Sequence, residues 1–376
     1  MENIYHVKDY IIESLKELNF KEFTDIQKKV IPNALKNQNI IGTSKTGSGK
    51  THSFLIPLFN KIKEDNNNLQ GLIILPTKEI ARQTYEFCKI INKYNDNKLD
   101  IKLYIGGNNK QKEINKLNNK NPQIAIGTPG RLYDLIIKEK ILQVQNVETL
   151  ILDEADMILD IGFLKEVDEI INKIKKPQFL IFSATLPPQI KAFLKKLYKN
   201  NYFIEIKGED FKTLKIKNFL IKSSDEEDKY NKFLNIINNI NPYMCLIFCN
   251  NYETCNKLYQ LLSEYDVGIL HKNIKDRQRK NILNNIKKLK YQYVVCTDLA
   301  SRGLDIIAVS HIINFDLPKD IDFFFHRIGR TGRNNMDGLT YSIYLPNETN
   351  IVNKIKEKGI NFINLKASKN SLIELK

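Results

Sequence analysis

The sequence predicts an α/β fold of two tandem domains, each a mainly parallel sheet flanked by helices. Three observations support this prediction: short runs of isoleucine, leucine and valine recur along the chain, amphipathic segments separate them, and the pattern begins again in the second half. Continuous apolar runs are typical of parallel strands buried on both faces, whereas strands with one solvated face alternate between apolar and polar residues. A chain of 376 residues is long enough for two domains that each bury a core.

The predicted strands can be assigned in order along the chain. In the first half they lie within residues 39–44, 71–77, 101–107, 123–129, 149–156 and 178–185, and the segments between them have helical periodicity. A strand-rich stretch at 201–222 leads to five more runs, within residues 243–250, 267–270, 292–298, 311–316 and 339–345. We place the domain boundary near Gly208, which gives an N-terminal domain of residues 1–207 and a C-terminal domain of residues 208–376.

The composition narrows the class of partner. The formal net charge is +15, from 58 basic and 43 acidic residues. This excess indicates a polyanionic partner such as nucleic acid, although a bias of the source genome toward lysine and asparagine codons would also supply much of it. No apolar run approaches membrane-spanning length, so we expect a cytoplasmic protein with no membrane partner. The five cysteines lack the spacing of zinc ligands and are expected to be reduced.

A phosphate-binding loop follows the first predicted strand. The stretch SKTGSGKT resembles the P-loop pattern, in which glycines let the backbone approach phosphates, a lysine reaches the outer phosphates and a hydroxyl holds Mg²⁺. A serine stands where the pattern begins with glycine. The predicted nucleotide-binding residues of this loop are Ser44, Lys45, Thr46, Gly47, Ser48, Gly49, Lys50 and Thr51.

Acidic residues follow the fifth predicted strand, in the sequence DEAD. Ligands of open parallel sheets bind beyond the carboxyl ends of the strands, so these residues are placed where a nucleotide would lie. We predict that Asp153 helps Thr51 to hold Mg²⁺, partly through water, and that Glu154 activates the attacking water.

A cationic turn, HRIGRTGR, lies late in the second half and begins at His326. Its guanidinium groups suit phosphate oxygens, which fits either an RNA-binding patch or a catalytic role. Only the first predicted domain carries a P-loop, so the second is expected to supply a complementary part. We predict that Arg330 and Arg333 act as arginine fingers that neutralise the transferring phosphoryl group.

Taken together, these motifs make the chain similar to DEAD-box RNA helicases, which have two RecA-like domains, and most similar to their bacterial cold-shock-type members. The resemblance covers essentially the whole chain, and its motifs occur in the order of the family. They lie at residues 20–27, 44–51, 76–83, 106–107, 128–131, 153–156, 183–185, 246–250, 297–306 and 326–333.

The resemblance implies ATP and Mg²⁺ as cofactors, RNA as the partner, and a monomeric core that works with accessory proteins. It implies that Gln27 and Phe20 contact the adenine and that Asp305 meets the ribose. Catalysis would involve His326 together with the residues named above, and hydrolysis would be coupled to domain closure by Asp156, Ser183, Thr185 and Arg327. The implied RNA-binding residues are Pro76, Thr77, Lys78, Gly106, Gly107, Thr128, Pro129, Arg131, Arg279 and Thr297.

Three functions share some of these features. The expected one is an ATP-dependent RNA helicase that opens short duplexes locally as its domains close. An ATP-gated RNA clamp, which holds a partner on RNA with little unwinding, would share all of the motifs. A GTPase is suggested only by the sequence NKLD at residues 97–100, which precedes the acidic motif instead of following it as in GTPases.

Overall fold

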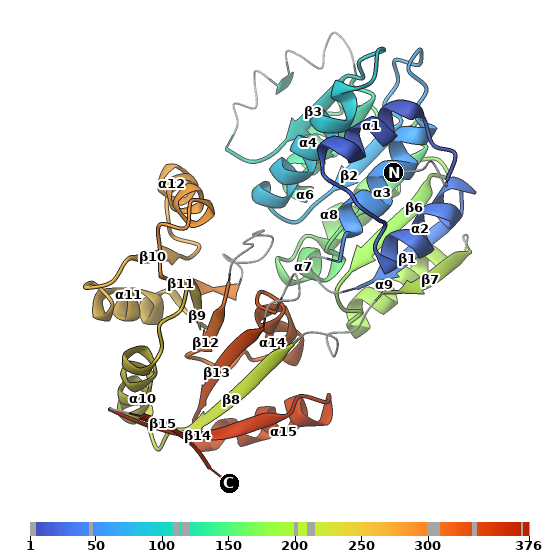
Figure 1. Cartoon of the computed structure of the whole chain (residues 1–376). Coiled ribbons are helices and arrows are strands. Elements are labelled where there is room, and N and C mark those ends of the chain that lie inside the picture. Colours follow the sequence, from blue (N-terminus) through green and yellow to red (C-terminus); the bar gives the residue numbers. More distant parts are fainter. Residues whose placement is uncertain are drawn as a thin grey trace. The chain divides into compact units, whose positions relative to one another are not determined.

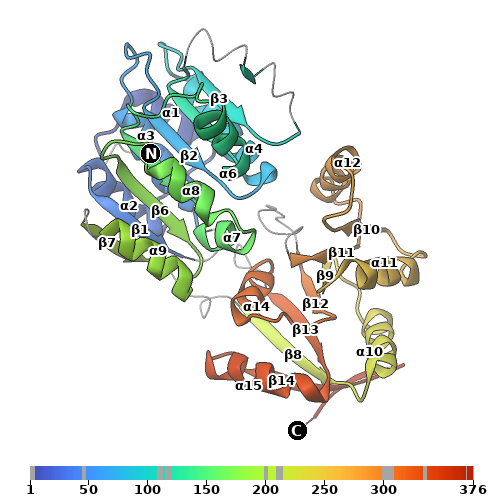
Figure 2. The same ribbon diagram turned by 180° about the vertical axis from the view of Figure 1, so that it is seen from behind.

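The computed structural model describes residues 5–44, 48–107, 113–114, 121–198, 202–208, 215–298, 309–332, 337–369 and 371–375. The chain divides into two compact units, Met1–Glu209 and Asp210–Lys376 (Figures 1 and 2). Each unit is a mainly parallel sheet with helices on both faces, which confirms the predicted fold class. No helix in these described ranges has both the length and the apolar character needed to cross a membrane.

The sheet of the first unit has the strand order β3-β4-β2-β5-β6-β1-β7 in the part of the chain that the structure describes, and all neighbouring strands are parallel. All six runs predicted in the first half contain strands. The strands are β1 (Asn39–Thr43), β2 (Gly71–Ile74), β3 (Ile101–Tyr104), β4 (Ile124–Gly127), β5 (Thr149–Leu152), β6 (Gln178–Ser183) and β7 (Phe203–Lys207).

Helices cover both faces of this sheet, as the continuous apolar strands require. Along β2, Ile73 packs in one core cluster, while Leu72 and Ile74 pack in the other. One face carries α1 (Asp9–Glu17), α2 (Asp25–Leu35), α3 (Lys50–Lys61) and α4 (Lys78–Lys93). The other carries α6 (Pro129–Tyr133), the π-helical turn η1 (Asp134–Lys138), α7 (Ala155–Asp160), α8 (Leu164–Ile171) and α9 (Pro188–Tyr198).

The second unit repeats this plan with the strand order β10-β11-β9-β12-β13-β8-β14-β15 among its described residues. Only the last pair in this order is antiparallel. The strands are β8 (Ile216–Lys222), β9 (Cys245–Cys249), β10 (Val267–Leu270), β11 (Tyr293–Thr297), β12 (His311–Asn314), β13 (Gly338–Tyr344), β14 (Phe362–Ser368) and β15 (Ser371–Glu374).

The helices of the second unit also pack on both faces. One face carries α10 (Glu226–Asn239) and α11 (Tyr252–Leu261). The other carries α12 (Asp276–Lys287), α14 (Ile321–Ile328) and α15 (Thr349–Glu357), the last of which follows the 3₁₀ turn η3 (Pro346–Glu348). All five cysteines are buried and free: Cys88, Cys245, Cys249, Cys255 and Cys296.

Candidate nucleotide and RNA site

The strand order of the first unit gathers the predicted site residues at one edge of the sheet. Because all its strands are parallel, their carboxyl ends lie at the same edge. The neighbours β5, β6 and β1 lead to the predicted nucleotide residues, Asp153, Ser183 and Ser44. The neighbours β3, β4 and β2 lead to the predicted RNA residues, Gly106, Thr128 and Thr77. Two groups of loops therefore lie side by side along one edge.

The described part of the P-loop has the geometry of a glycine turn entering a helix. Gly49 has a φ of 94° and stands immediately before α3. A Cβ atom at this position would lie 2.5 Å from Nε2 of Gln27 and 2.9 Å from Oγ1 of Thr24, so only glycine fits. The hydroxyl groups of Ser44 and Ser48 share a hydrogen bond across the loop. Lys45, Thr46 and Gly47 lie outside the described residues.

Lys50 connects the P-loop to the acidic motif. Its side chain is only 5% exposed, and its Nζ atom donates a hydrogen bond to the carbonyl oxygen of Ser44 over 2.9 Å. The same Nζ atom lies 3.5 Å from Oε1 of Glu154. A buried ammonium group at the start of a helix, beside a loop of backbone N–H groups, is suited to bind phosphate oxygens. Thr51 follows directly, in the first turn of α3.

Asp153 is a buried carboxylate with an unusual charge environment. Burial, together with the neighbouring carboxylate of Glu154, raises the pKa of Asp153 to about 7, although Lys50 opposes the shift. The backbone N–H of Glu154 donates to Oδ1 of Asp153 over 2.9 Å, and Glu154 itself adopts a left-handed conformation with a φ of 51°. Two crowded carboxylates favour an additional cation at this point.

The residues present fit the predicted Mg²⁺ ion. Mg²⁺ prefers oxygen ligands and is usually bound by one or two protein groups together with water and substrate phosphates. Asp153 offers a carboxylate, and Thr51 offers a hydroxyl group. Within the described ranges, no group of three or more histidine, cysteine, aspartate or glutamate side chains could hold a metal ion.

A hydrogen-bonded unit joins the acidic motif to the end of β6. The backbone N–H of Asp156 donates to Oγ of Ser183 over 3.1 Å, and Oγ of Ser183 donates to the carbonyl oxygen of Thr185 over 2.6 Å. Both the backbone N–H and the hydroxyl of Thr185 donate to Oδ2 of Asp156, over 3.0 and 2.9 Å. A shift of either loop would therefore move the other.

Both polar atoms of the Gln27 side chain form hydrogen bonds next to the P-loop. It is 1% exposed; its Oε1 atom accepts from the backbone N–H of Thr24 over 2.9 Å, and its Nε2 atom donates to the carbonyl oxygen of Gly49 over 3.0 Å. Phe20 lies nearby, with its ring centroid 4.8 Å from that of His52 on α3. Both predicted adenine contacts are thus close to the P-loop helix. The bond to Gly49 was missed by sequence reasoning, because no local pattern pairs residues so far apart.

The predicted RNA residues of the first unit begin helices or form turns. Thr77 caps α4 by accepting a hydrogen bond from the backbone N–H of Ile80 over 3.3 Å, and Pro76 precedes it. Thr128 stands before α6, and Pro129 is the first residue of that helix. A Cβ atom on Gly106 would lie 3.4 Å from Cε of Lys78, so the loops after β3 and β2 are adjacent. Gly107 has a φ of 91°.

Arg131 has a protein partner in this structure. It is 10% exposed, and its guanidinium group lies 2.5 Å from Oε2 of Glu113. If Arg131 binds an RNA phosphate as predicted, the phosphate must replace this carboxylate. The pairing could not be predicted from the sequence, because Glu113 belongs to a different segment from Arg131.

In the second unit, Arg327 forms a buried network. It is 1% exposed and donates from Nε and Nη2 to the two carboxylate oxygens of Asp298, over 2.6 Å each. Nη1 donates to the carbonyl oxygen of Asp316 over 2.6 Å, and Nη2 donates to Oδ1 of Asn250 over 3.2 Å. The hydrogen bonds of the Arg327 guanidinium group therefore connect the cationic turn to the ends of β9, β11 and β12. Sequence reasoning did not find these three partners.

The remaining predicted residues of the second unit occupy different environments. His326 and Arg330 are 6% and 4% exposed. Thr297 ends β11, and Arg279 is partly exposed on α12. Asp305 and Arg333 lie outside the described residues.

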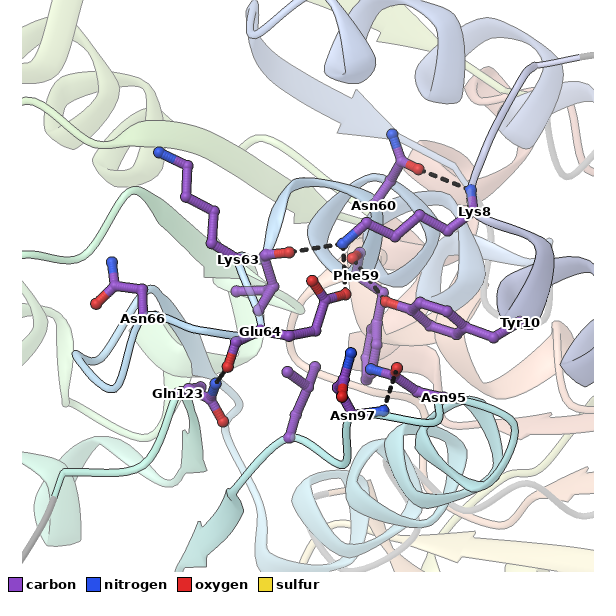
Figure 3. Close-up of polar contacts among 12 residues, drawn as sticks. Lys8, Tyr10, Phe59, Asn60, Lys63, Glu64, Asn66, Asn95, Asn97 and Gln123 are labelled. Atoms are coloured by element: carbon purple, nitrogen blue, oxygen red, sulfur yellow. Dashed lines mark hydrogen bonds and ion pairs between the residues drawn. The ribbon is translucent and has the colours of Figure 1, made fainter.

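The sequence NKLD lies at the wrong edge of the first sheet for guanine recognition. Asp100 immediately precedes β3, whereas the P-loop follows the carboxyl end of β1. Oδ1 of Asn95 accepts the backbone N–H of Asn97, as Figure 3 shows, so the segment forms a tight turn. Because the two strands belong to one parallel sheet, the turn and the P-loop lie at opposite edges. The GTPase interpretation is therefore not supported.

Comparisons with known proteins agree with this geometry. Residues 24–193 match the DEAD/DEAH box helicase family, and residues 228–335 match the helicase conserved C-terminal domain. The DEAD-box ATP-dependent RNA helicase CshB of Bacillus subtilis is 40% identical over 97% of this chain and 84% of its own length. CshB of Staphylococcus aureus is 37% identical over 99% of this chain and 83% of its own length.

A solved structure shares the fold over nearly the whole chain. Dbp5 of Saccharomyces cerevisiae, bound to RNA and ADP BeF3, superposes with a TM-score of 0.84 at 26% identity and covers 96% of this chain and 94% of its own. The match extends over both units. The chain belongs to the DEAD-box helicase family, as its motifs predicted.

Proposed function

We propose that this protein is an ATP-dependent RNA helicase that opens short duplexes locally. The proposal rests mainly on the edge of the first sheet, where Lys50, Glu154 and Asp153 lie close together and the three loops after β2, β3 and β4 lie along the same edge. Relatives named as ATP-dependent RNA helicases support the same activity. They favour unwinding over the ATP-gated clamp.

The nucleotide site has a role for each central residue. Lys50 and the P-loop backbone would bind the β- and γ-phosphates, while Gln27 and Phe20 would meet the adenine. Glu154 would orient the attacking water and accept its proton. Asp153 and Thr51 would hold Mg²⁺, which when bound neutralises charge on the phosphates.

The RNA contacts would be made mainly to the sugar-phosphate backbone. Thr77 and Thr128 stand at the N-termini of helices, where hydroxyl and backbone N–H groups suit phosphate oxygens. Gly106 and Gly107 would let the RNA approach closely. Thr297 and Arg279 would extend the contact in the second unit. Such contacts carry little sequence specificity.

Hydrolysis would be coupled to unwinding through closure of the two units. ATP and RNA would together stabilise a closed state in which Arg330 and Arg333 neutralise the γ-phosphate and Asp305 contacts the ribose. The hydrogen-bonded unit of Asp156, Ser183 and Thr185 would transmit the state of the nucleotide to its surroundings. Phosphate release would then restore the open state.

The test pairs two measurements on the full chain. ATP turnover is measured with and without single-stranded RNA, and the separation of a short labelled RNA duplex is followed after ATP is added. We expect RNA to accelerate turnover and ATP to accelerate strand separation. RNA-dependent turnover without strand separation would favour the clamp, and GTP preferred over ATP would contradict the adenine assignment.

A further inference from the structure

The second unit carries a hollow that the nucleotide and RNA sites do not use. It has a volume of about 460 Å³ and lies where α11 ends and β10 and β11 begin. Its lining residues are Tyr259, Gln260, Ser263, Tyr265, Asp266, Val267 and Tyr291. We call it the tyrosine pocket. In the parallel part of this sheet the predicted RNA residue Thr297 lies at the carboxyl end of β11, so the pocket is at the opposite edge.

Two of the three tyrosine rings are held in place by their neighbours. The ring of Tyr265 lies against that of buried Tyr293, with centroids 5.2 Å apart and an interplanar angle of 77°. The hydroxyl of Tyr291 accepts a hydrogen bond from Asn285 over 3.1 Å. A Cβ atom on Gly268 would lie 2.9 Å from the Tyr291 ring, so the glycine leaves room for that ring. The pocket is therefore largely preformed.

The rings nevertheless remain accessible. Tyr259 is 38% exposed and Tyr265 is 37% exposed. Exposed tyrosines are enriched at binding surfaces, because the ring supplies apolar contact area while the hydroxyl remains hydrated. Leu261 beside the pocket is also exposed. The aromatic surface is thus available to a partner.

The charge of the pocket differs from that of the chain as a whole. The protein carries a net charge of +15, yet the pocket's lining holds the carboxylate of Asp266 and, among the described residues, neither lysine nor arginine. Glu264, two residues earlier, is exposed as well. The nearest basic residues in sequence, Lys288 and Lys290, are exposed just before Tyr291 but are not part of the lining. With three tyrosine rings, one carboxylate and no cationic side chain among its described lining residues, the pocket itself favours a cation over an RNA phosphate.

We propose that the tyrosine pocket binds an arginine side chain in a basic peptide segment of a partner protein. A guanidinium group can stack on a tyrosine ring and donate hydrogen bonds to a carboxylate at the same time. The pocket offers tyrosine rings for stacking, from Tyr259, Tyr265 and Tyr291. It offers a carboxylate for hydrogen bonding, from Asp266. The hydroxyl of Ser263 and the amide of Gln260 can accept hydrogen bonds from the peptide.

The proposal is tested with a defined peptide on the full chain. The probe is a fluorescein-labelled peptide of alternating arginine and glycine residues, and its control carries citrulline, which is neutral and nearly isosteric, in place of each arginine. Binding is measured by fluorescence anisotropy. We expect the arginine peptide to bind at least tenfold more tightly than the citrulline peptide. Equal binding of the two peptides, or no binding, would overturn the proposal.

Variants then locate the contact. Tyr265→Ala and Asp266→Asn should each weaken binding of the arginine peptide by about 5- to 30-fold, in line with a cation–π or charge-assisted contact. Tyr243→Ala is the matched control, because Tyr243 is a 65% exposed tyrosine outside the pocket. Gly268→Ala, which displaces the Tyr291 ring, should weaken binding without removing a contacting side chain. Variants that leave the affinity unchanged would contradict the assignment.

A last measurement separates this peptide site from an RNA-stacking site. Because the pocket lies away from the predicted RNA residues, Tyr265→Ala should leave single-stranded RNA affinity and RNA-stimulated ATP turnover within twofold of the parent. Base stacking on exposed tyrosines is the alternative. If the variant lost RNA affinity instead of peptide affinity, the pocket would be an RNA contact and the proposal would be wrong.

Discussion

At the scale of the residue, the ion pair between Lys50 and Glu154 indicates how closely phosphate binding and water activation are placed. We expect Glu154→Gln to lower ATP turnover by roughly 10²- to 10⁴-fold, because the amide cannot accept the proton of the attacking water. Binding of ATP should remain, since Lys50 and the P-loop are unchanged. Turnover is measured with saturating RNA, and nucleotide affinity is measured with a fluorescent ATP analogue.

The control for this variant is Glu86→Gln, which removes a carboxylate outside every motif whose side chain is 61% exposed. Its turnover should equal that of the parent. Near-normal turnover of Glu154→Gln would show that another group activates the water.

Buried His52 should make the stability of the folded protein depend on pH. It lies on α3 between the rings of Phe20 and Phe87, and burial lowers its pKa to about 4. Between pH 6.5 and pH 4 the unfolded chain therefore binds a proton that the folded chain does not. The contribution of neutral His52 to the stability of the folded protein is complete above pH 6.5, and it is lost as the pH falls toward 4. The loss should reach about 3 kcal/mol in the free energy of unfolding.

The measurement compares urea unfolding of the parent and of His52→Leu across this pH range. The Nε2 atom of His52 has no hydrogen-bond partner among the described residues, so leucine removes the titration without leaving a partner unpaired. The variant should lose less stability on acidification than the parent. Identical pH dependence in the two proteins would mean that His52 does not titrate as proposed.

At the scale of the element, the segment before α1 is fastened to the end of the P-loop helix. Figure 3 shows the contacts: Nζ of Lys8 donates to the carbonyl oxygen of Ile62 over 2.7 Å and to Oε1 of Glu64 over 2.6 Å. The backbone N–H of Lys8 donates to Oδ1 of Asn60, and the hydroxyl of Tyr10 donates to the carbonyl oxygen of Phe59. A cation at the C-terminal end of α3 is also favoured by the helix dipole.

We therefore expect Lys8→Ala to lower the unfolding free energy of the first unit by about 1 to 2 kcal/mol, because it removes two charge-assisted hydrogen bonds from a partly covered site. Lys16→Ala is the control. Its ion pair with Glu13 has the same 2.6 Å distance, but both side chains are about half exposed, so the loss should stay within about 0.5 kcal/mol. Thermal and urea unfolding measure both values, and equal losses would contradict the argument.

The elements also show what the sequence could predict. Strands such as β2 and β5 were predictable, because every residue in them is apolar or buried and turn residues bound them. The acidic motif and the P-loop were predictable for the same reason: each directly follows a strand. Strands β14 and β15 were not predicted, since the segment is rich in lysine and serine and only partly buried.

The order of the strands could not be deduced from the sequence, because it depends on pairings between distant segments. The same is true of the site contacts that the sequence missed. Gln27 with Gly49, Arg131 with Glu113 and Arg327 with Asp298 each join residues from separate elements. Motifs contain both members of the first and third pairs, and Arg131 of the second, but no local pattern indicates which residues will contact one another.

At the scale of the whole molecule, the net charge of +15 should make RNA binding depend strongly on salt. Backbone-dominated binding of single-stranded RNA falls with salt at a slope of about −0.7 per phosphate contacted. We expect Lys78→Gln to reduce the slope by about one such contact, whereas Lys16→Gln, which changes a lysine far along the chain from any predicted RNA residue, should leave it unchanged. A slope near zero in the parent would contradict backbone recognition.

ATP hydrolysis in the first unit is proposed to depend on an arginine of the second unit. Arg330 is proposed to neutralise the γ-phosphate, yet it is only 4% exposed in the second unit, so a structural role must be distinguished from a catalytic one. Arg330→Ala should lower RNA-stimulated turnover by about 10³-fold while ATP binding and the melting temperature of the second unit stay close to those of the parent. Arg277→Ala, which changes an exposed arginine of α12, should affect RNA affinity at most. If Arg330→Ala instead unfolded the second unit, or weakened only RNA binding, then the arginine would act within its own unit and another group would have to neutralise the phosphate.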